Sequence, residues 1–315
     1  MATAFLFPGL NALLRKSDRY RFLHLPEVQA CFRRAEAIIQ ERFGYHFNFK
    51  EFLELPAEDI YALKNISLAA VAICCIQTGV ARRLRDLEGD PDWVMGCSLG
   101  DLARAVFAGT YTFEDAIYNH IHFTRSIDGI DKIGRNIAVL TPRGAPFTEQ
   151  DYAWFEANNV DVSCLTPRFL NIGGRYADLD EVERYAKDKG WNVMRILDYP
   201  VHSRYILPYV QAVENDFASV HTGHPRVPIF SSLSAQPLMD PKQIKQEFLL
   251  SITKPIHWSR AVQKLSQDHR IDRFVNIGPC RSLTGLMREI PVQAVTVEAS
   301  DLIAGAVMNA ELAGV

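Results

Sequence analysis

The residues most able to do chemistry lie in the short segment GCSLG, residues 96–100. This G-x-S-x-G pattern follows an apolar run at 93–95 and precedes an amphipathic stretch at 98–109. A serine between small residues at a strand-to-helix turn is typical of a nucleophile elbow, in which the hydroxyl lies at a helix N-terminus. The alternative is a serine that only caps the helix. The strand and the helix on either side favour a nucleophile at Ser98.

A serine hydroxyl is a weak nucleophile at neutral pH and requires a base beside it. His202 is the candidate, in the segment DYPVHSRYILPYV at 198–210. A turn that contains proline brings this histidine directly before an amphipathic helix. A lone histidine is more often structural, so its setting alone does not assign it the role of base.

The elements that would position these residues alternate between helical patterns and short β-branched runs, which is typical of an α/β fold. Segments 3–9 and 93–98 are predicted to be strands, and 27–44 is predicted to be an amphipathic helix that ends at Gly44. The apolar segment ISLAAVAICCIQTGVARRL, residues 66–84, is predicted to be a core helix, because polar residues interrupt it and it is shorter than a bilayer-spanning helix requires.

After residue 130 the order of elements changes to strand, helix, strand, strand, helix, strand. A unit of this order is typical of the ferredoxin-like motif. We therefore expect residues 131–198 to form a small ferredoxin-like subdomain, inserted into a larger subdomain made of residues 1–130 and 199–315.

The composition argues against several classes of function. A net charge of -3 over 315 residues gives no electrostatic reason to expect nucleic acid or an anionic membrane as a partner. The six cysteines show no C-x-x-C spacing and the nine histidines are scattered, so neither a metal site nor a disulfide framework is predicted. The N-terminus lacks the features of a signal peptide, and we therefore expect a cytoplasmic protein.

Seven motifs, in order along nearly the whole chain, resemble one protein family. They are FLFPG (5–9), GCSLGDLARAVFAG (96–109), FEDA (113–116), PVHSRY (200–205), VPIFSSLSAQP (227–237), TKPIHWSRAV (253–262) and FVNIGPCRSLTGLM (274–287). The chain resembles malonyl-CoA:acyl carrier protein transacylases and the acyltransferase domains of polyketide synthases. The resemblance implies an α/β-hydrolase-like large subdomain with a ferredoxin-like insert. It also implies a catalytic dyad in which Ser98 is the nucleophile and His202 the base.

The same resemblance implies three backbone groups around the dyad. A main-chain carbonyl orients the histidine in this family, and Ser251 occupies the corresponding place. A carbonyl does not depend on the identity of its side chain, so the orienting contact survives the replacement of the usual glutamine. The family's oxyanion hole consists of two backbone N–H groups, at the positions of Leu10 and Leu99 here. Each such donor contributes on the order of 3 kcal/mol of transition-state stabilisation.

The substrate pocket departs from the family's pattern. An arginine 25 residues after the nucleophile binds the malonyl carboxylate in the family, and Phe123 stands at this position. Arg125 lies two residues further, which turns its side chain by about 200° to the opposite face of a helix. Apolar or small residues also replace polar ones at Cys97, Leu165 and Phe169. These four replacements predict an apolar acyl pocket.

An unpaired malonyl carboxylate would cost several kcal/mol to bury in such a pocket, whereas an apolar chain gains about 25 cal/mol for each Å² it hides. The alternative is that these replacements are sequence drift in an inactive paralogue. An inactive protein, however, has no need to keep the dyad and the turns that form the oxyanion hole. We expect a free-standing enzyme that forms an acyl-serine from non-malonyl acyl thioesters.

Three functions follow from this expectation. The first is an acyl hydrolase that clears acyl groups from acyl carrier proteins in polyketide or fatty acid biosynthesis, as arginine-lacking members of the family do. The second is a trans-acting transacylase that moves a starter or intermediate acyl unit between coenzyme A and carrier protein. The third is a non-catalytic scaffold that binds carrier protein. In each case we expect a monomer without a bound cofactor, whose substrate arrives on phosphopantetheine of the carrier protein or on coenzyme A.

Overall fold

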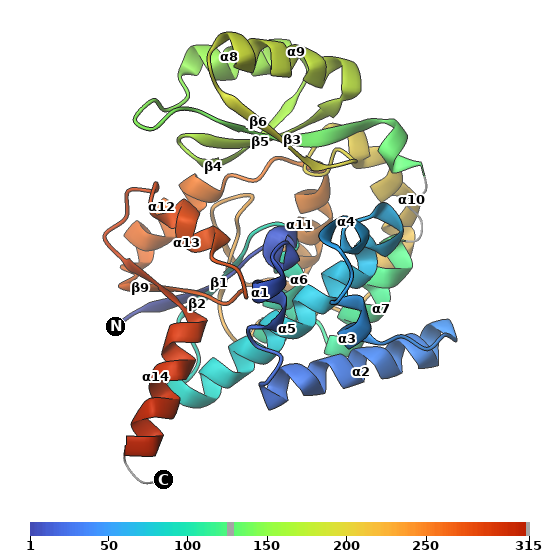
Figure 1. Cartoon of the computed structure of the whole chain (residues 1–315), viewed down its shortest axis with the longest axis vertical. Coiled ribbons are helices and arrows are strands. Elements are labelled where there is room, and N and C mark those ends of the chain that lie inside the picture. The colour runs from blue at the N-terminus through green and yellow to red at the C-terminus, as the bar shows by residue number, and fades with distance from the viewer. Residues whose placement is uncertain (125–128, 313–315) are drawn as a thin grey trace.

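The computed structural model describes residues 1–124 and 129–312, which form two packed α/β subdomains, each with its own sheet (Figure 1). The strands of the larger sheet are β1 (Thr3–Phe7), β2 (Trp93–Gly96), β7 (Ile229–Phe230), β8 (Pro237–Leu238), β9 (Arg273–Asn276) and β10 (Val295–Glu298). Their order is β10-β9-β1-β2-β7-β8, and every pairing is parallel except that of β7 with β8. All five residues of β1 are buried, as expected for a parallel strand that is covered on both faces.

Helices cover both faces of this sheet. The helices of the large subdomain, some of which pack on other helices and not on the sheet, are α1 (Lys16–Tyr20), α2 (Pro26–Phe43), α3 (Phe49–Phe52), α4 (Ala57–Ile60), α5 (Ile66–Glu88), α6 (Gly100–Ala108), α7 (Phe113–Thr124), α10 (Leu207–Ala218), α11 (Pro241–Thr253), α12 (Trp258–His269), α13 (Ser282–Met287) and α14 (Ala299–Leu312). As the sequence predicts, α2 ends at Gly44, which adopts the left-handed conformation with φ of 75°.

Helix α5 runs through the interior and forms much of the large core. It is longer than the sequence led us to expect, because the helix continues beyond Leu84 through Arg85 to Glu88. The prediction that this segment is too short to span a bilayer was therefore wrong. Among the described residues, Leu63–Glu88 is the one helical stretch long and apolar enough to cross a membrane by length and composition, but 72% of its apolar window is buried within the protein. The prediction of a core helix is confirmed.

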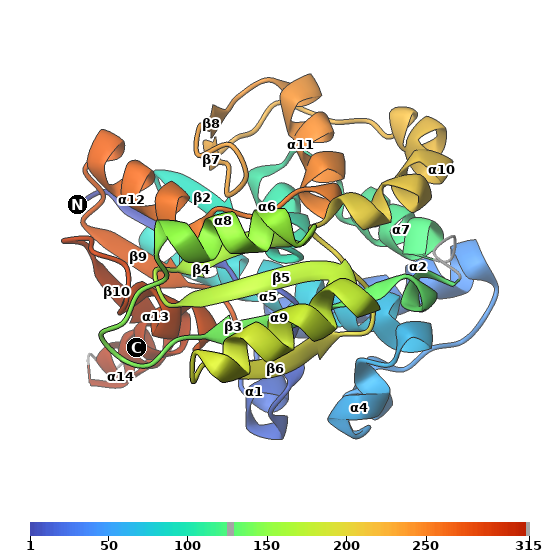
Figure 2. The same cartoon turned by 90° about the horizontal axis from the view of Figure 1, so that it is seen from above.

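The smaller sheet lies across the top of the molecule in Figure 1. Its strands are β3 (Gly134–Leu140), β4 (Asp161–Thr166), β5 (Phe169–Arg175) and β6 (Asn192–Leu197), and its helices are α8 (Glu149–Ala157) and α9 (Tyr176–Asp188). The order β4-β5-β3-β6 is antiparallel throughout, which is the ferredoxin-like arrangement. Both helices cover the outer face of the sheet (Figure 2), so its inner face is turned toward the large subdomain.

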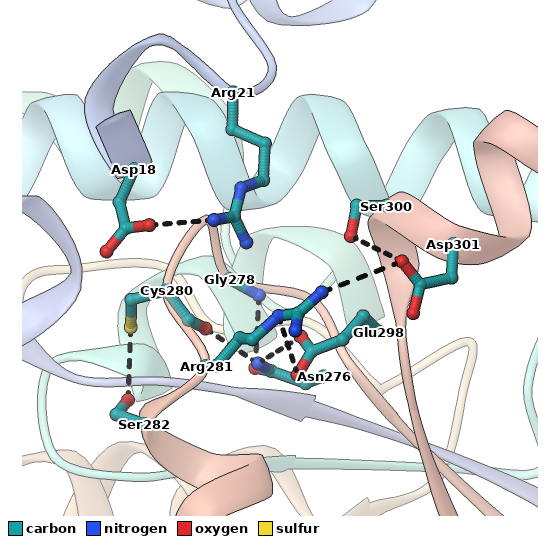
Figure 3. A network of polar contacts seen from close by, with 10 residues as sticks. All are labelled: Asp18, Arg21, Asn276, Gly278, Cys280, Arg281, Ser282, Glu298, Ser300 and Asp301. Carbon is teal, nitrogen blue, oxygen red and sulfur yellow. Dashed lines mark hydrogen bonds and ion pairs between the residues drawn. The ribbon is translucent and has the colours of Figure 1, made fainter. Parts of the chain in front are cut away.

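The parallel strands β1, β2 and β9 end at the same edge of the large sheet, where ligands bind in open α/β sheets. A polar network stiffens the loop after β9 (Figure 3). The Asn276 amide donates to the Cys280 carbonyl over 2.7 Å and to the Glu298 carboxylate over 2.9 Å. A Cβ atom on Gly278 would collide with Pro8, so this loop packs directly against the turn that follows β1.

Candidate active site

Ser98 lies in the tight turn between β2 and α6. Its φ angle of 57° is uncommon for a residue other than glycine and is typical of a nucleophile elbow. The two flanking glycines are required because the chain has no room for a side chain there. A Cβ atom on Gly96 would collide with Asp101, and one on Gly100 would collide with the Phe7 carbonyl oxygen. The G-x-S-x-G pattern therefore reflects the close approach of β1, β2 and α6.

His202 and Ser98 lie 104 positions apart in the chain and meet in the structure. The Ser98 hydroxyl oxygen is 2.6 Å from His202 Nε2, and His202 Nδ1 is 2.5 Å from the Ser251 carbonyl oxygen. A carbonyl oxygen only accepts hydrogen bonds, so Nδ1 carries the proton and Nε2 is free to accept from the serine hydroxyl. Burial lowers the pKa of His202 to about 4, against the opposing effect of the hydrogen bond to Ser251. The imidazole is therefore neutral near pH 7, which is the form a base requires.

The loop that carries His202 is held from two sides. From the large subdomain, the His202 backbone N–H donates to the Ile252 carbonyl at the end of α11 over 2.7 Å. From the small sheet, the Asn136 amide donates to the Val201 carbonyl over 3.0 Å. The buried Asp161 carboxylate accepts the Arg204 backbone N–H over 2.6 Å. The base is thus positioned by both subdomains.

The two residues predicted to supply the oxyanion-hole N–H groups line the same cavity as Ser98. Leu10 begins the short helical turn after β1, and Leu99 directly follows the nucleophile. In the described part of the chain, neither backbone N–H has a hydrogen-bond partner, and both residues line the cavity next to Ser98. The Tyr61 hydroxyl fixes the turn by donating to the Leu10 carbonyl over 2.5 Å and accepting the Leu13 N–H over 2.8 Å.

A cavity of about 200 Å³ lies beside Ser98 and His202, with walls from α6, α7, α10 and α11. Most of its lining is apolar and includes Leu102, Phe123, Val213, Phe217, Phe248 and Leu249. No lysine or arginine belongs to the lining as far as residues 1–124 and 129–312 are concerned, whereas Asp101 and Asp115 do line it. The described part of the lining is therefore mainly apolar, with two carboxylates and no cation.

The structure separates the four residues predicted for the acyl pocket. Phe123 lines the cavity, with its ring centroid 5.4 Å from that of Phe217. Cys97 is buried in a second apolar cluster behind the elbow, and Leu165 packs against that cluster. Phe169 begins β5, and like Cys97 and Leu165 it is absent from the described lining of the cavity. Arg125 lies outside the described residues.

Sequence reasoning missed a buried ionic group beneath the elbow. Arg104 in α6 has no solvent exposure, and its guanidinium lies 3.3 Å from the Asp101 carboxylate. Burial raises the pKa of Glu247 in α11 to about 7, although the nearby Arg104 opposes the shift. The available signal was an arginine in the apolar stretch LARAVFA, where a charge has to be paired.

Comparison with known proteins assigns most of the chain to one family. A family model described as "Acyl transferase domain" matches residues 22–305. Malonyl CoA-acyl carrier protein transacylase of Bacillus subtilis (strain 168) is 23% identical over 304 residues, covering 95% of this chain and 93% of that protein. Non-reducing polyketide synthase stmB of Aspergillus ustus is 25% identical over 305 residues, but the chain spans only 14% of its length.

Solved structures share the whole fold. A malonyl-transacylase determined in complex with a type II polyketide synthase acyl-carrier protein superimposes with a TM-score of 0.83 at 19% identity, covering 98% of this chain and 100% of that one. The predicted α/β fold with its two subdomains is confirmed.

Proposed function

We propose, from the premise that the chain belongs to the acyl transferase domain family, that it is an acyl hydrolase which clears non-malonyl acyl groups from acyl carrier proteins. The observation that carries this proposal is the apolar cavity beside the Ser98–His202 pair, in which Phe123 stands where the related transacylases are expected to hold an arginine. An anionic acyl group would meet Asp101 and Asp115 in that lining and no described cation.

The dyad would act in two steps. In the first, Ser98 Oγ attacks the thioester carbonyl carbon while its proton passes to His202 Nε2, which then protonates the departing phosphopantetheine thiolate. In the second, water attacks the acyl-serine and gives its proton to Nε2, from which Ser98 Oγ recovers it as the free acid leaves. The Leu10 and Leu99 N–H groups would donate to the carbonyl oxygen as it becomes negatively charged in each tetrahedral intermediate.

The second candidate is a transacylase, in which the thiol of a carrier protein replaces water in the second step. The coverage of nearly the whole Bacillus subtilis transacylase supports this candidate, as does the likeness to a transacylase that was solved with an acyl-carrier protein. A carrier protein is thus the proposed partner in both cases. A non-catalytic scaffold is the third reading, and it predicts no thioester chemistry at Ser98.

Intact-protein mass spectrometry with malonyl, acetyl and hexanoyl thioesters, with and without holo carrier protein, tests the proposal. The expected result is acetyl or hexanoyl adducts on Ser98 that decay to free acid in the absence of carrier protein, with slower malonyl labelling. An adduct that is stable to water and discharged only by carrier protein would favour the transacylase. Unchanged thioester turnover in Ser98→Ala would favour the scaffold, and efficient malonyl loading would contradict the proposed specificity.

Substitution at Phe123 tests whether the residue at this position decides between malonyl and apolar acyl groups. Phe123→Arg is expected to increase malonyl labelling relative to hexanoyl labelling, because it adds a cation to the lining. Phe123→Leu is the matched control and should keep the preference for hexanoyl. If the unsubstituted protein loads malonyl and Arg125→Ala abolishes that loading, Arg125 binds the carboxylate and the proposal for Phe123 fails.

A further inference from the structure

Two polar residues on α7 line the acyl cavity, and no hydrogen bond to either side chain is found among the described residues. His120 and Asn119 line the cavity beside Phe123, one helical turn before it. Within residues 1–124 and 129–312, neither the His120 imidazole nor the Asn119 amide makes a hydrogen bond to another side chain or to the backbone. Polar groups in an apolar cavity cost free energy unless a partner satisfies them.

The chemistry of these groups limits what the partner can be. Burial lowers the pKa of His120 to about 4, so its imidazole is neutral near pH 7 and offers one donor and one acceptor. The Asn119 amide likewise offers both. A carboxylate would gain no charge pairing from neutral groups, and Asp101 and Asp115 line the same cavity. A hydroxyl group, which donates and accepts, matches both side chains.

We propose that His120 and Asn119 recognise a hydroxyl group on the acyl chain, so that the substrates are hydroxyacyl thioesters rather than saturated ones. This inference rests on the proposed function, because it assumes that the acyl chain bound to Ser98 occupies this cavity. Asn119 and His120 are half-buried in the protein itself. A site built to hydrogen-bond a substrate hydroxyl discriminates strongly against the analogue that lacks it, since a bound apolar chain would cover these polar groups and leave them unpaired.

The size of the cavity sets the probe. An apolar protein cavity of about 150 Å³ holds a benzene molecule, which has six non-hydrogen atoms. The cavity of about 200 Å³ thus holds an acyl group of about eight such atoms, by simple proportion. A hydroxyhexanoyl group has this size. Because the position of the hydroxyl along the chain is open, the test uses both the 3-hydroxy and the 5-hydroxy isomer.

The experiment measures kcat/KM for acylation of Ser98 by hexanoyl, 3-hydroxyhexanoyl, 5-hydroxyhexanoyl, 3-oxohexanoyl and malonyl thioesters. In the unsubstituted protein, one hydroxyhexanoyl isomer is expected to exceed hexanoyl by about tenfold or more. In His120→Phe, which keeps a ring and removes the polar atoms, the preference is expected to fall to within about twofold while hexanoyl acylation persists. Asn119→Leu should reduce the preference in part. His122→Phe, on the same helix and outside the described cavity lining, is the matched control and should keep it.

The inference is overturned if hexanoyl reacts as fast as both hydroxy isomers, if 3-oxohexanoyl reacts faster than both, or if the preference survives in His120→Phe and Asn119→Leu. Loss of malonyl loading in His120→Phe would instead assign His120 to a carboxylate and also overturn it. These outcomes differ from failure of the proposed function, in which malonyl labels Ser98 efficiently, the acyl adduct is stable to water, or no thioester labels Ser98 at all. Circular dichroism of each variant establishes that a lost preference does not reflect unfolding.

Discussion

At the scale of single residues, the protonation state of His202 decides whether Ser98 is activated. The pKa of His202, lowered to about 4 by burial, predicts that kcat/KM for acylation stays level from pH 8 to about pH 5 and falls only as pH approaches 4. An ordinary histidine would produce the fall near pH 6.5. Rapid-mixing measurements of Ser98 acylation over pH 4–8 check this prediction, with the exposed His24→Gln as control.

The lowered pKa of His202 also affects the stability of the folded protein. Between pH 6.5 and 4, His202 of the unfolded chain binds a proton that the folded protein excludes, so its contribution destabilises the fold progressively as pH falls through this window. Acylation must therefore be measured only where circular dichroism reports a folded protein. A half-maximal rate near pH 6.5 in folded protein would contradict the assignment of a neutral, buried base.

The tight turn at Ser98 was predictable from the sequence because its surroundings are local. The strand, the two glycines and the helix that shape the Ser98 turn are all sequence neighbours, and their spacing carries the geometric requirement. The residues that hold the His202 loop were not predictable, because Asn136 and Asp161 are more than 40 positions away and belong to another sheet. Nothing in their local pattern distinguishes them from other polar residues at strand positions.

At the scale of elements, ionisable side chains are buried both in the helix that follows Ser98 and in the helix whose Ser251 carbonyl contacts His202. Arg104 lies in α6, and Glu247 lies one turn before Ser251 in α11. The pKa of Glu247, raised by burial to about 7, means that the folded protein keeps a proton that the unfolded chain has released between pH 4.5 and 7. This contribution to stability is therefore lost as pH rises through that window.

Glu247→Gln is expected to remove the pH-dependent contribution that Glu247 makes to the stability of the fold. The free energy of unfolding of the unsubstituted protein should fall by on the order of 3 kcal/mol more than that of the variant between pH 4.5 and 7.5, as a shift of this size implies. Urea titrations at the two pH values measure the difference, and Glu58→Gln, at an exposed position, is the control. Parallel pH dependences in the variant and the unsubstituted protein would show that Glu247 does not carry the effect.

The elements themselves followed closely from the sequence. The alternating order of strands and helices between residues 134 and 197 was readable because each element carries its own periodicity. Helix α5 extends past its predicted end at Leu84 because Arg85, Asp86 and Glu88 interrupt the apolar pattern without interrupting the helix. Long charged side chains at the end of a buried helix extend their charged groups toward solvent. Charged residues in the sequence therefore indicate where the helix approaches the surface, and not where it ends.

At the scale of the whole molecule, the small subdomain contributes Leu197 to the cavity lining and holds the loop that carries His202. The Glu289 carboxylate after α13 binds Thr166 over 2.8 Å and Arg168 over 2.7 Å, which fixes the loop between β4 and β5 to the large subdomain. Gly173 of β5 leaves room for the loop, because a Cβ atom there would lie 2.9 Å from the Ser203 Cβ atom. Docking of one subdomain on the other is therefore coupled to the geometry of the dyad.

Asn136→Ala tests this coupling. The substitution removes the amide that donates to the Val201 carbonyl and to the Asn171 side chain, and it leaves the Val201 carbonyl without that partner. An unpaired buried carbonyl costs about 1–3 kcal/mol, so the loop is expected to relax and His202 to move away from Ser98. The expected result is a fall in kcat for Ser98 acylation of about tenfold or more, with a smaller change in KM, because Asn136 itself does not line the acyl cavity although Val201 does.

The matched control is Asp180→Ala on the exposed face of the same subdomain, where the carboxylate only pairs with Arg135 over 3.1 Å at the surface. It should leave both kcat and the melting temperature nearly unchanged. A variant at Asn136 that loses melting temperature but keeps kcat would show that the amide only stabilises the fold. A loss of kcat with intact near-ultraviolet circular dichroism would instead show that the inserted subdomain positions the base across the interface, which neither subdomain could do alone.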